Sequence, residues 1–383
     1  MPKNIKINGL PFYWRLKDIS SKNLDSISTN YNFEFDYISS YELLIQKRDK
    51  KILKALKKIY LEEYNIGYLQ EGYEIAQNYG IDFLEYIKKN LSKRNIKKIL
   101  EIGCGGCIIL ENLKNMGYDV MGIDSNPSSE TIGNKKNIKV INDFFPSSKL
   151  SFNFDLIYHS DVLEHIDDFE TFLKHHYDLL NNNGLIIVNV PDNTENYEIG
   201  DISMAMHQHL NYFTKSSLKL TLEKNNFQII DIRKAGYGGS LYATAKKSTK
   251  KNNYLSDSNI LNYNQFNNNF FNKIITVRKL ISNIINKNKS FGFYVPLRAL
   301  PYIFYLNINH KFRFFDDTSH WHQREFDGIK IKIENFEDLK RNPVDCIFII
   351  SLTFDNIIEE KIKNYYENIK IIKLRDMLSI KPD

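Results

Sequence analysis

The chain has 383 residues, of which 42% are hydrophobic and 26% charged, and its 52 Lys and Arg against 46 Asp and Glu leave a net charge of +6. This length exceeds one ordinary hydrophobic core, so the composition indicates a globular protein of two or three domains. Positive charge is spread along the chain without a long basic block, so we expect a small anionic substrate and no nucleic-acid partner.

Membrane and targeting signals are not visible in the sequence. No apolar run approaches the roughly 20 residues that a membrane span needs, and the first residues lack the apolar core of a signal peptide. Three cysteines suit a reducing compartment. We therefore expect a cytoplasmic protein without a membrane span, whose oligomeric state the sequence does not predict.

Residues 1–75 form a mixed N-terminal segment. It contains a helical pattern at Ile52–Tyr64 and a tyrosine cluster made of Tyr60, Tyr64, Tyr68 and Tyr73. We interpret this segment as a candidate cover for an active site.

Residues 76–247 alternate between helical patterns and short apolar runs. The runs are 97–102, 119–123, 138–142, 154–158, 184–190, 227–233 and 241–246. Such alternation predicts a mainly parallel sheet with helices on both faces, and a turn at 236–239 predicts that the last two runs form a hairpin.

Residues 248–383 are expected to form a second domain. The polar, Asn-rich stretch 247–269 is typical of a linker that leads into a helix. Strand-like runs then follow at 290–295, 311–315, 346–351 and 369–374. The expected fold class is thus α/β, a Rossmann-like domain followed by a second, smaller Rossmann-like α/β domain.

The stretch KKILEIGCGGCIILENL, residues 97–113, holds Cys104 and Cys107 in a C-x-x-C frame. A structural zinc site needs about four ligands, and the third cysteine, Cys346, is far away in the chain. A redox pair needs only these two cysteines and remains an alternative, but it does not account for Glu101 and the glycines. The whole stretch 97–113 fits a strand that ends in a carboxylate, followed by a glycine turn and a helix. We therefore predict a nucleotide-binding turn in which the two cysteines pack as small side chains. No metal site is expected.

Ligands of open α/β sheets bind at the carboxyl ends of the strands, so the residues that follow each strand are the site candidates. Small and polar residues follow four successive strands: Glu101, Gly103 and Gly105; Asp124 and Ser125; Asn142, Asp143 and Phe144; His159, Ser160 and Asp161. Glu164 and His165 follow in a helical turn and are interpreted as structural. Asp124 lies about twenty residues beyond the glycine turn, where an acidic side chain can accept both ribose hydroxyls.

NAD-binding domains share a glycine turn and an acid, but their G-x-G-x-x-G fingerprint would need a glycine at Ile108. The E-x-G-x-G form, followed by IDSNP, NDFF and FDLIYHSDVLEHIDD, resembles the class I S-adenosylmethionine-dependent methyltransferases over residues 81–247. The resemblance implies S-adenosyl-L-methionine as cofactor, its methionine moiety at Glu101 and residues 103–105, its ribose at Asp124 and its adenine at residues 142–144. The family's third turn glycine is Cys107 here, whose side chain is expected to point away from the cofactor.

The segment MAMHQHLNYF, residues 204–213, supplies the catalytic candidates. Methyl transfer is an in-line displacement that often needs a base to remove a proton. His207 and His209 are two residues apart, so on an extended segment both imidazoles would lie on one side. A buried, hydrogen-bonded histidine pair is the structural alternative.

Several stretches resemble the nucleotide-sugar C-methyltransferases that act on keto sugars: HQHLNYFT, AGYGGSLYATA, FRFFDDTSHWHQREFDGIKI and VDCIFIISLTFDNIIEE. The resemblance implies a sugar nucleotide between the middle and terminal domains, His209 as the base that forms an enolate, and His207 and Gln208 beside it. The substrate residues that it implies are Tyr212, Gly238, Gly239 and Ser240.

This likeness has departures. The family's tyrosine, glutamate and arginine in these motifs are Met206, Gln208 and Tyr242 here, and no cysteine-rich zinc module precedes Cys104. O-methylation of a sugar therefore remains an alternative, as do a non-catalytic binding protein and an NAD-linked epimerase or reductase. Nucleobase methylation is disfavoured, because the fourth strand ends in HSDVLEH and no basic stripe is visible.

Overall fold

The computed structural model describes residues 4–12, 30–61, 74–92, 94–151, 153–248, 260–287, 289–326 and 329–379. These residues fall into two compact units. The central unit lies within Tyr37–Asp192 and Leu210–Ser258, and the terminal unit lies within Met1–Asp36, Asn193–His209 and Asn259–Asp383.

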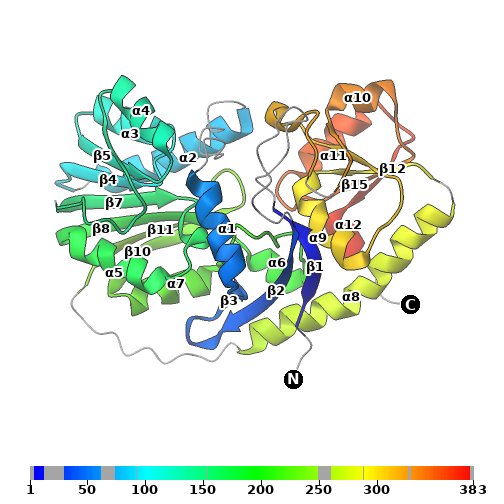
Figure 1. Cartoon of the computed structure of the whole chain (residues 1–383), viewed down its shortest axis with the longest axis horizontal. Coiled ribbons are helices and arrows are strands. Elements are labelled where there is room, and N and C mark those ends of the chain that lie inside the picture. Colours follow the sequence, from blue (N-terminus) through cyan, green and yellow to red (C-terminus); the bar gives the residue numbers. More distant parts are fainter. Residues whose placement is uncertain are drawn as a thin grey trace. The chain divides into compact units, whose positions relative to one another are not determined.

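A seven-stranded sheet forms the middle of the central unit, in the order β10-β11-β8-β7-β4-β5-β6 (Figure 1). Its strands are β4 (Lys98–Ile102), β5 (Asp119–Asp124), β6 (Lys139–Asn142), β7 (Phe154–Ser160), β8 (Leu180–Pro191), β10 (Phe227–Lys234) and β11 (Ser240–Lys247). The pairs from β6 across to β8 are parallel, whereas β11 runs antiparallel to both β8 and β10. The carboxyl ends of β4 to β7 therefore meet at one edge of the sheet.

Helices cover both faces of this sheet. They are α2 (Glu74–Leu91), α3 (Ile108–Asn115), α4 (Pro127–Lys135), α5 (Phe169–Leu179) and α7 (Lys215–Lys224). Neighbouring strand residues enter opposite cores, because Ile99 and Leu156 pack with α2 and α3 while Leu100 and Ile157 pack with α5 and α7. Two covered faces require nearly continuous apolar strands, which is the pattern the sequence shows.

Local signals begin several of these helices. Asn126 caps α4 by accepting a hydrogen bond from the Ser128 amide, and Pro127 occupies the first helical position. Thr214 and Ser217 form a reciprocal capping box at the start of α7. These caps place the loops that follow β5 and β9 in fixed conformations.

Shorter elements complete the central unit. They are η1 (Ser39–Tyr41), β3 (Leu43–Gln46), α1 (Lys50–Leu61), η3 (Leu163–His165) and β9 (Asn211–Tyr212). β3 pairs antiparallel with β9. Arg48 ties this pair together, since its guanidinium donates to the carbonyl oxygens of Gln46 and Leu210 and to Oδ1 of Asn211.

The terminal unit contains a five-stranded, fully parallel sheet in the order β14-β13-β12-β15-β16. Its strands are β12 (Phe291–Tyr294), β13 (Arg313–Phe315), β14 (Ile333–Glu334), β15 (Cys346–Ile349) and β16 (Lys370–Lys373). The accompanying helices are α9 (Pro296–Leu306), η4 (Ser319–Trp321), α10 (Phe336–Arg341), α11 (Asp355–Lys363) and α12 (Leu374–Ser379). This strand order confirms the predicted second, smaller Rossmann-like α/β fold.

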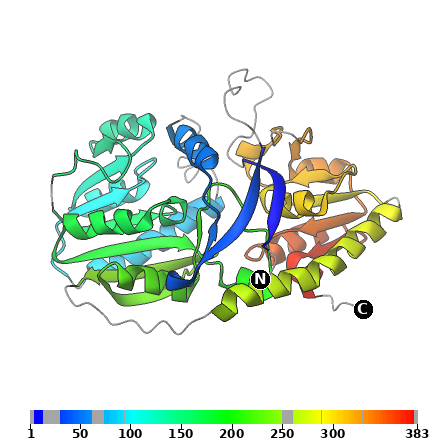
Figure 2. The same cartoon turned by 60° about the horizontal axis from the view of Figure 1, so that its bottom comes forward.

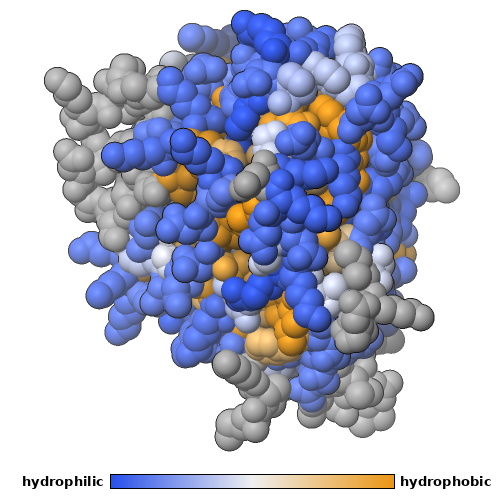
Figure 3. Space-filling model, turned by 90° about the vertical axis from the view of Figure 1, so that its right-hand side faces the viewer, coloured by the Kyte–Doolittle hydropathy of each residue, from blue (hydrophilic) through white to orange (hydrophobic). Residues whose placement is uncertain are grey.

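Further segments belong to the terminal unit. β1 (Lys6–Pro11) pairs antiparallel with β2 (Asn30–Ile38). The long helix α8 (Ile260–Asn286), visible in Figure 2, contacts α6 (Thr194–Ile199) and α12. Asp201 accepts a hydrogen bond from the Tyr302 hydroxyl (2.8 Å), and Arg375 makes two bonds to the Glu195 carboxylate (2.7 and 3.0 Å). The face carrying this unit shows apolar side chains in patches separated by polar ones (Figure 3).

The predicted elements agree with most of this architecture. The expected runs of the central sheet correspond to β4–β8, β10 and β11, and the last two form the predicted antiparallel hairpin. The sequence reasoning missed β1, β2, β3, β9 and β14. It also placed the helix after the Asn-rich stretch too late, because α8 already includes Ile260.

The boundaries predicted at 75/76 and 247/248 are linear, whereas the compact units interleave along the chain. Residues 193–209, expected in the methyltransferase domain, are part of the terminal unit. Of the predicted tyrosine cluster, Tyr64, Tyr68 and Tyr73 lie outside the described residues. None of the helices in the described ranges is long and apolar enough to cross a membrane.

Candidate active site

The turn between β4 and α3 is held in an unusual backbone conformation. Gly103, Gly105 and Cys107 all have positive φ angles, of 71°, 46° and 59°. A Cβ on Gly103 would lie 2.7 Å from Cγ2 of Val162, so glycine is needed there for space as well as for φ. Cys107 is fully buried with its Sγ 3.9 Å from Sγ of Cys104, which agrees with two small packing residues.

Asp124, at the end of β5, fixes this turn. Its Oδ2 accepts a hydrogen bond from the Gly105 amide (2.9 Å) and its Oδ1 accepts one from the Asn126 amide (2.8 Å). The carbonyl oxygens of Asp124 and Ser125 in turn accept hydrogen bonds from the Asn142 side-chain amide (3.1 Å each). Residues predicted after three different strands are thus joined in one hydrogen-bonded network.

Glu101 lies beneath the same turn and is only 5% exposed. Its Oε2 accepts a hydrogen bond from the Tyr158 hydroxyl (2.8 Å), and burial raises its pKa well above the usual range. A carboxylate held in such a place is stabilised by a positively charged partner. The ammonium group of a bound S-adenosylmethionine would supply that charge, so the residues present fit this cofactor.

The residues at the end of β6 are more exposed to solvent than Glu101 and Asp124. The hydroxyl of Ser147 donates to Asp143 and lowers the pKa of that carboxyl, while the Phe144 amide donates to the other oxygen. The ammonium of Lys57, on α1, lies 5.7 Å from the centre of the Phe144 ring. Helix α1 also reaches the end of β5, since the Ser125 hydroxyl donates to the carbonyl oxygen of Tyr60 (3.4 Å).

His159 and Ser160, at the end of β7, take different positions. His159 is fully buried against Phe172 and His176 of α5, and burial lowers its pKa well below the ordinary value. Its ring therefore packs in the core below the strand end, which gives no support to its predicted cofactor role. Ser160 instead joins a polar network with Asp161.

Tyr79, on α2, is the centre of that network. Its hydroxyl donates to Oδ1 of Asp161 (2.9 Å), lies 2.8 Å from the Ser240 hydroxyl and accepts from Nδ2 of the Asn189 side chain (2.8 Å). The Ser160 hydroxyl donates to Oδ2 of Asp161 (3.1 Å) and accepts from the Asn189 amide (2.7 Å). Side chains from α2, β7, β8 and β11 thus meet at the carboxyl edge of the sheet.

The predicted substrate residues Gly238, Gly239 and Ser240 lie beside this network. A Cβ on Gly238 would lie 2.9 Å from Cδ2 of Tyr79, and the Gly239 carbonyl accepts from the Asp192 amide. Asp82, also on α2, anchors the same turn. Its Oδ2 accepts from the amides of Gly236 and Tyr237 and from the hydroxyl of Tyr242, at 2.9, 3.2 and 2.9 Å.

The predicted catalytic segment turns instead of running straight, because the His209 amide donates to the Met206 carbonyl (3.1 Å). The extended-strand argument for two imidazoles on one side was therefore wrong. His207 is fully buried, and its Nε2 lies 2.9 Å from the Leu10 carbonyl oxygen, which favours the structural alternative. Gln208 is also buried, whereas His209 is partly exposed.

The substrate candidate Tyr212 is fully buried on β9, so its side chain does not face an open cleft. Neighbouring residues of β9 approach the end of β7. The Leu210 backbone amide donates to the Glu164 carbonyl oxygen (2.7 Å), and the Asn211 side-chain amide donates to the carbonyl oxygens of Leu163 and Ile166. The residue that follows His209 is thus bonded to the loop after β7.

Sequence reasoning missed Tyr79 and Asp82 as site candidates. It placed Asp161 after Ser160 at the strand end, and it favoured a structural role for Glu164. Tyr79 and Asp82 lie on a helix, and their partners in the 236–242 turn are about 160 residues away in the chain. Nothing in the local sequence signals these contacts.

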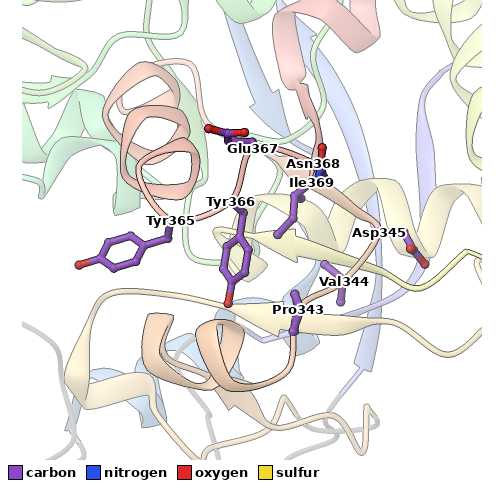
Figure 4. A pocket seen from close by; sticks show the side chains of 8 residues that line it. All are labelled: Pro343, Val344, Asp345, Tyr365, Tyr366, Glu367, Asn368 and Ile369. Carbon is purple, nitrogen blue, oxygen red and sulfur yellow. The ribbon is translucent and has the colours of Figure 1, made fainter.

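An open depression of about 480 Å³ lies elsewhere, in the terminal unit (Figure 4). Residues at the starts of β15 and β16 line it, among them Val344, Asp345 and Ile369, together with Tyr365 and Tyr366. Ligands of parallel sheets bind at the opposite, carboxyl ends of strands. We therefore assign no function to this depression.

The sheet order of the central unit, its reversed β11, the glycine turn after β4 and the acid after β5 define the Rossmann-like fold of class I methyltransferases. Comparison with known families agrees with this class. Residues 73–232 match the family described as "Methyltransferase domain". The central unit is therefore an S-adenosylmethionine-dependent methyltransferase domain.

Curated relatives carry the name ubiquinone biosynthesis O-methyltransferase. The protein of Pelagibacter ubique is 30% identical over 130 residues, which cover 27% of this chain and 50% of that protein. The protein of Rickettsia typhi is 25% identical over 228 residues, covering 54% of this chain and 88% of that protein. The chain thus spans about half the length of the first of these relatives.

Two solved structures that are similar to part of the chain can be named. One is the N-methyltransferase NodS of Bradyrhizobium japonicum in complex with S-adenosyl-L-homocysteine, at 14% identity and a TM-score of 0.39, covering 51% of this chain and 98% of that one. Another is magnesium protoporphyrin IX methyltransferase of Synechocystis, at 14% identity and a TM-score of 0.41, covering 51% and 100%.

Proposed function

We propose that the protein transfers a methyl group from S-adenosylmethionine to a small molecule, and that this molecule is a nucleotide-activated sugar. The observation that carries the first part is the convergence of Glu101, Gly105, Asp124 and Asn142 at the carboxyl edge of the central sheet. The second part rests on the sequence likeness to nucleotide-sugar methyltransferases.

The cofactor residues take the following proposed roles. Glu101 and the backbone of residues 103–105 hold the methionine moiety, and Asp124 and Ser125 bind the ribose. Asn142, Asp143 and Phe144 surround the adenine. The cofactor, when bound, supplies an electrophilic methyl group, and the protein orients it and excludes water.

Two acceptor chemistries are candidates. In C-methylation His209 removes the proton beside a ketone and the resulting enolate carbon attacks the methyl group. The sequence motifs HQHLNYFT and AGYGGSLYATA favour this reaction. In O-methylation a sugar hydroxyl is the nucleophile, which is supported by the O-methyltransferase names of the curated relatives.

The test begins with cofactor binding. Calorimetric titration is expected to show tight binding of S-adenosylhomocysteine and none of NAD. Methyl-labelled S-adenosylmethionine is then incubated with a panel of nucleotide sugars that carry hydroxyl or keto groups, and the product mass and methyl position are determined. Binding without product from any sugar would instead support the non-catalytic alternative, and binding of NAD alone would contradict the proposal.

A further inference from the structure

Two buried acceptor groups at the carboxyl edge of the central sheet have unused hydrogen-bonding capacity. Glu164 is 1% exposed, and neither of its carboxylate oxygens has a hydrogen-bond partner among the described residues. Asn189 is fully buried, and its Oδ1 has no such partner either. Buried polar atoms in this state are uncommon in native proteins, and a catalytic role or a bound water, ion or ligand is among their explanations.

Asp161 is partly exposed and lies close to both groups, since its backbone amide donates to the Asn189 carbonyl oxygen (3.0 Å) and burial together with the Asp161 charge raises the pKa of Glu164. Its φ of 53° is a left-handed conformation, which Asp adopts more readily than most other non-glycine residues. Hydrogen bonds from Tyr79 and Ser160 fix one direction of each carboxylate oxygen, and each oxygen can accept one more. Asp161 is thus a preorganised acceptor that a small molecule can reach.

We propose that Asp161, with Glu164 behind it, forms the methyl-acceptor subsite, that the group methylated there is a hydroxyl, and that Asp161 takes its proton. This inference rests on the proposed function and selects O-methylation within it. The hydroxyl oxygen forms the new bond to the methyl carbon, the hydroxyl proton passes to the Asp161 carboxylate, and the electron pair of the broken S–CH3 bond stays on sulfur.

The charges at this edge decide between the two acceptor chemistries. An enolate oxygen gains negative charge in the transition state and needs hydrogen-bond donors around it. The Asp161 carboxylate would instead repel that charge, whereas it attracts the proton of a hydroxyl. Burial raises the pKa of Glu164 well above the usual range, so Glu164 adds no second negative charge. Burial raises the pKa of Asp161 to about 6, which places its proton affinity in the range of an effective general base.

The inference can be tested without knowing the substrate. Sinefungin carries an amine where S-adenosylmethionine has its methylsulfonium, whereas S-adenosylhomocysteine has a neutral thioether. If Asp161 and Glu164 face the transferred methyl, the ammonium of sinefungin gains a charge-assisted hydrogen bond, and calorimetry should show it binding tenfold or more tighter than S-adenosylhomocysteine, about 1.4 kcal/mol.

Variants assign the preference to these residues. Asp161→Asn should reduce the preference for sinefungin to near unity while leaving S-adenosylhomocysteine affinity unchanged. Glu164→Gln should reduce the same preference to a smaller extent. Asp178→Asn is the matched control, because Asp178 pairs with Lys174 on the exposed face of α5. Thermal unfolding of each variant checks that it is folded.

The outcomes are distinguishable. Equal affinity of the wild-type protein for both ligands, or an unchanged preference in folded Asp161→Asn, would overturn the inference and leave the proposed function standing. Failure of both ligands to bind would overturn the proposed function itself. If calorimetry shows Mg²⁺ binding that abolishes the preference, the carboxylates hold a cation and the inference is wrong. A carbon-methylated product from a keto-sugar nucleotide would also refute it.

Discussion

Replacement of Gly103 by alanine tests the turn on which cofactor binding depends. The φ of 71° at this position costs an L-residue about 1–2 kcal/mol. The new Cβ would also lie 2.7 Å from Cγ2 of Val162, and displacing this β-branched side chain adds roughly 1 kcal/mol. We therefore expect the turn of Gly103→Ala to relax into another conformation. Restoring the original turn when the cofactor binds should then cost about 2 kcal/mol of binding free energy.

Two measurements check this estimate. Affinity for S-adenosylhomocysteine, measured by calorimetry, should fall about thirtyfold, because binding must restore the original turn. The matched control is Gly80→Ala on α2, where an added Cβ meets nothing within 4 Å. Urea unfolding should show this control to be more stable by about 0.5–1 kcal/mol. Wild-type affinity in Gly103→Ala would refute the argument that the turn must adopt a left-handed conformation.

Three further predictions address the remaining features. In the C-methylation candidate His209→Ala should abolish turnover while cofactor affinity stays nearly intact, whereas O-methylation with Asp161 as the base predicts an active His209→Ala variant. Asp82→Ala loses three hydrogen bonds and should reduce the free energy of unfolding by about 2–3 kcal/mol, against about 1 kcal/mol for Tyr242→Phe, which removes one; equal effects in urea unfolding would contradict this. Burial lowers the pKa of His176 from 6.5 to about 4, so its contribution to stability is lost as the pH falls from 6.5 towards 4. The free energy of unfolding should therefore fall by about 2 kcal/mol less between pH 7 and pH 5 in His176→Gln than in the wild type, and parallel pH curves would count against the assignment.

The sheets were predictable because their strands are buried on both faces. Such strands are short apolar runs, and polar residues directly follow them, so Glu101, Asp124 and Asn142 could be placed from the sequence alone. The antiparallel strands β3 and β9 were missed because they have only four and two residues. Their pairing is fixed by Arg48, which no local pattern reveals.

The catalytic candidates show the limit of spacing arguments. Two histidines two residues apart point to the same side only if the backbone between them is extended. Here a turn closes between Met206 and His209, and one ring is buried while the other is partly exposed. The Tyr79 network was equally hidden, because its members come together only through the packing of α2 on the sheet.

The interleaving of the two units has a practical consequence for anyone who wants to cut the molecule apart. A fragment ending near residue 248 would retain α6 but lack helix α8, which α6 contacts in the full chain, and it would also lack Arg375, which binds Glu195. The fragment would expose the face of α6 that α8 covers, and it should aggregate or be degraded. A single cut in the chain therefore cannot separate the methyltransferase unit from the terminal unit, because residues 193–209 of the terminal unit lie within its sequence. The two units must be expressed and recombined together.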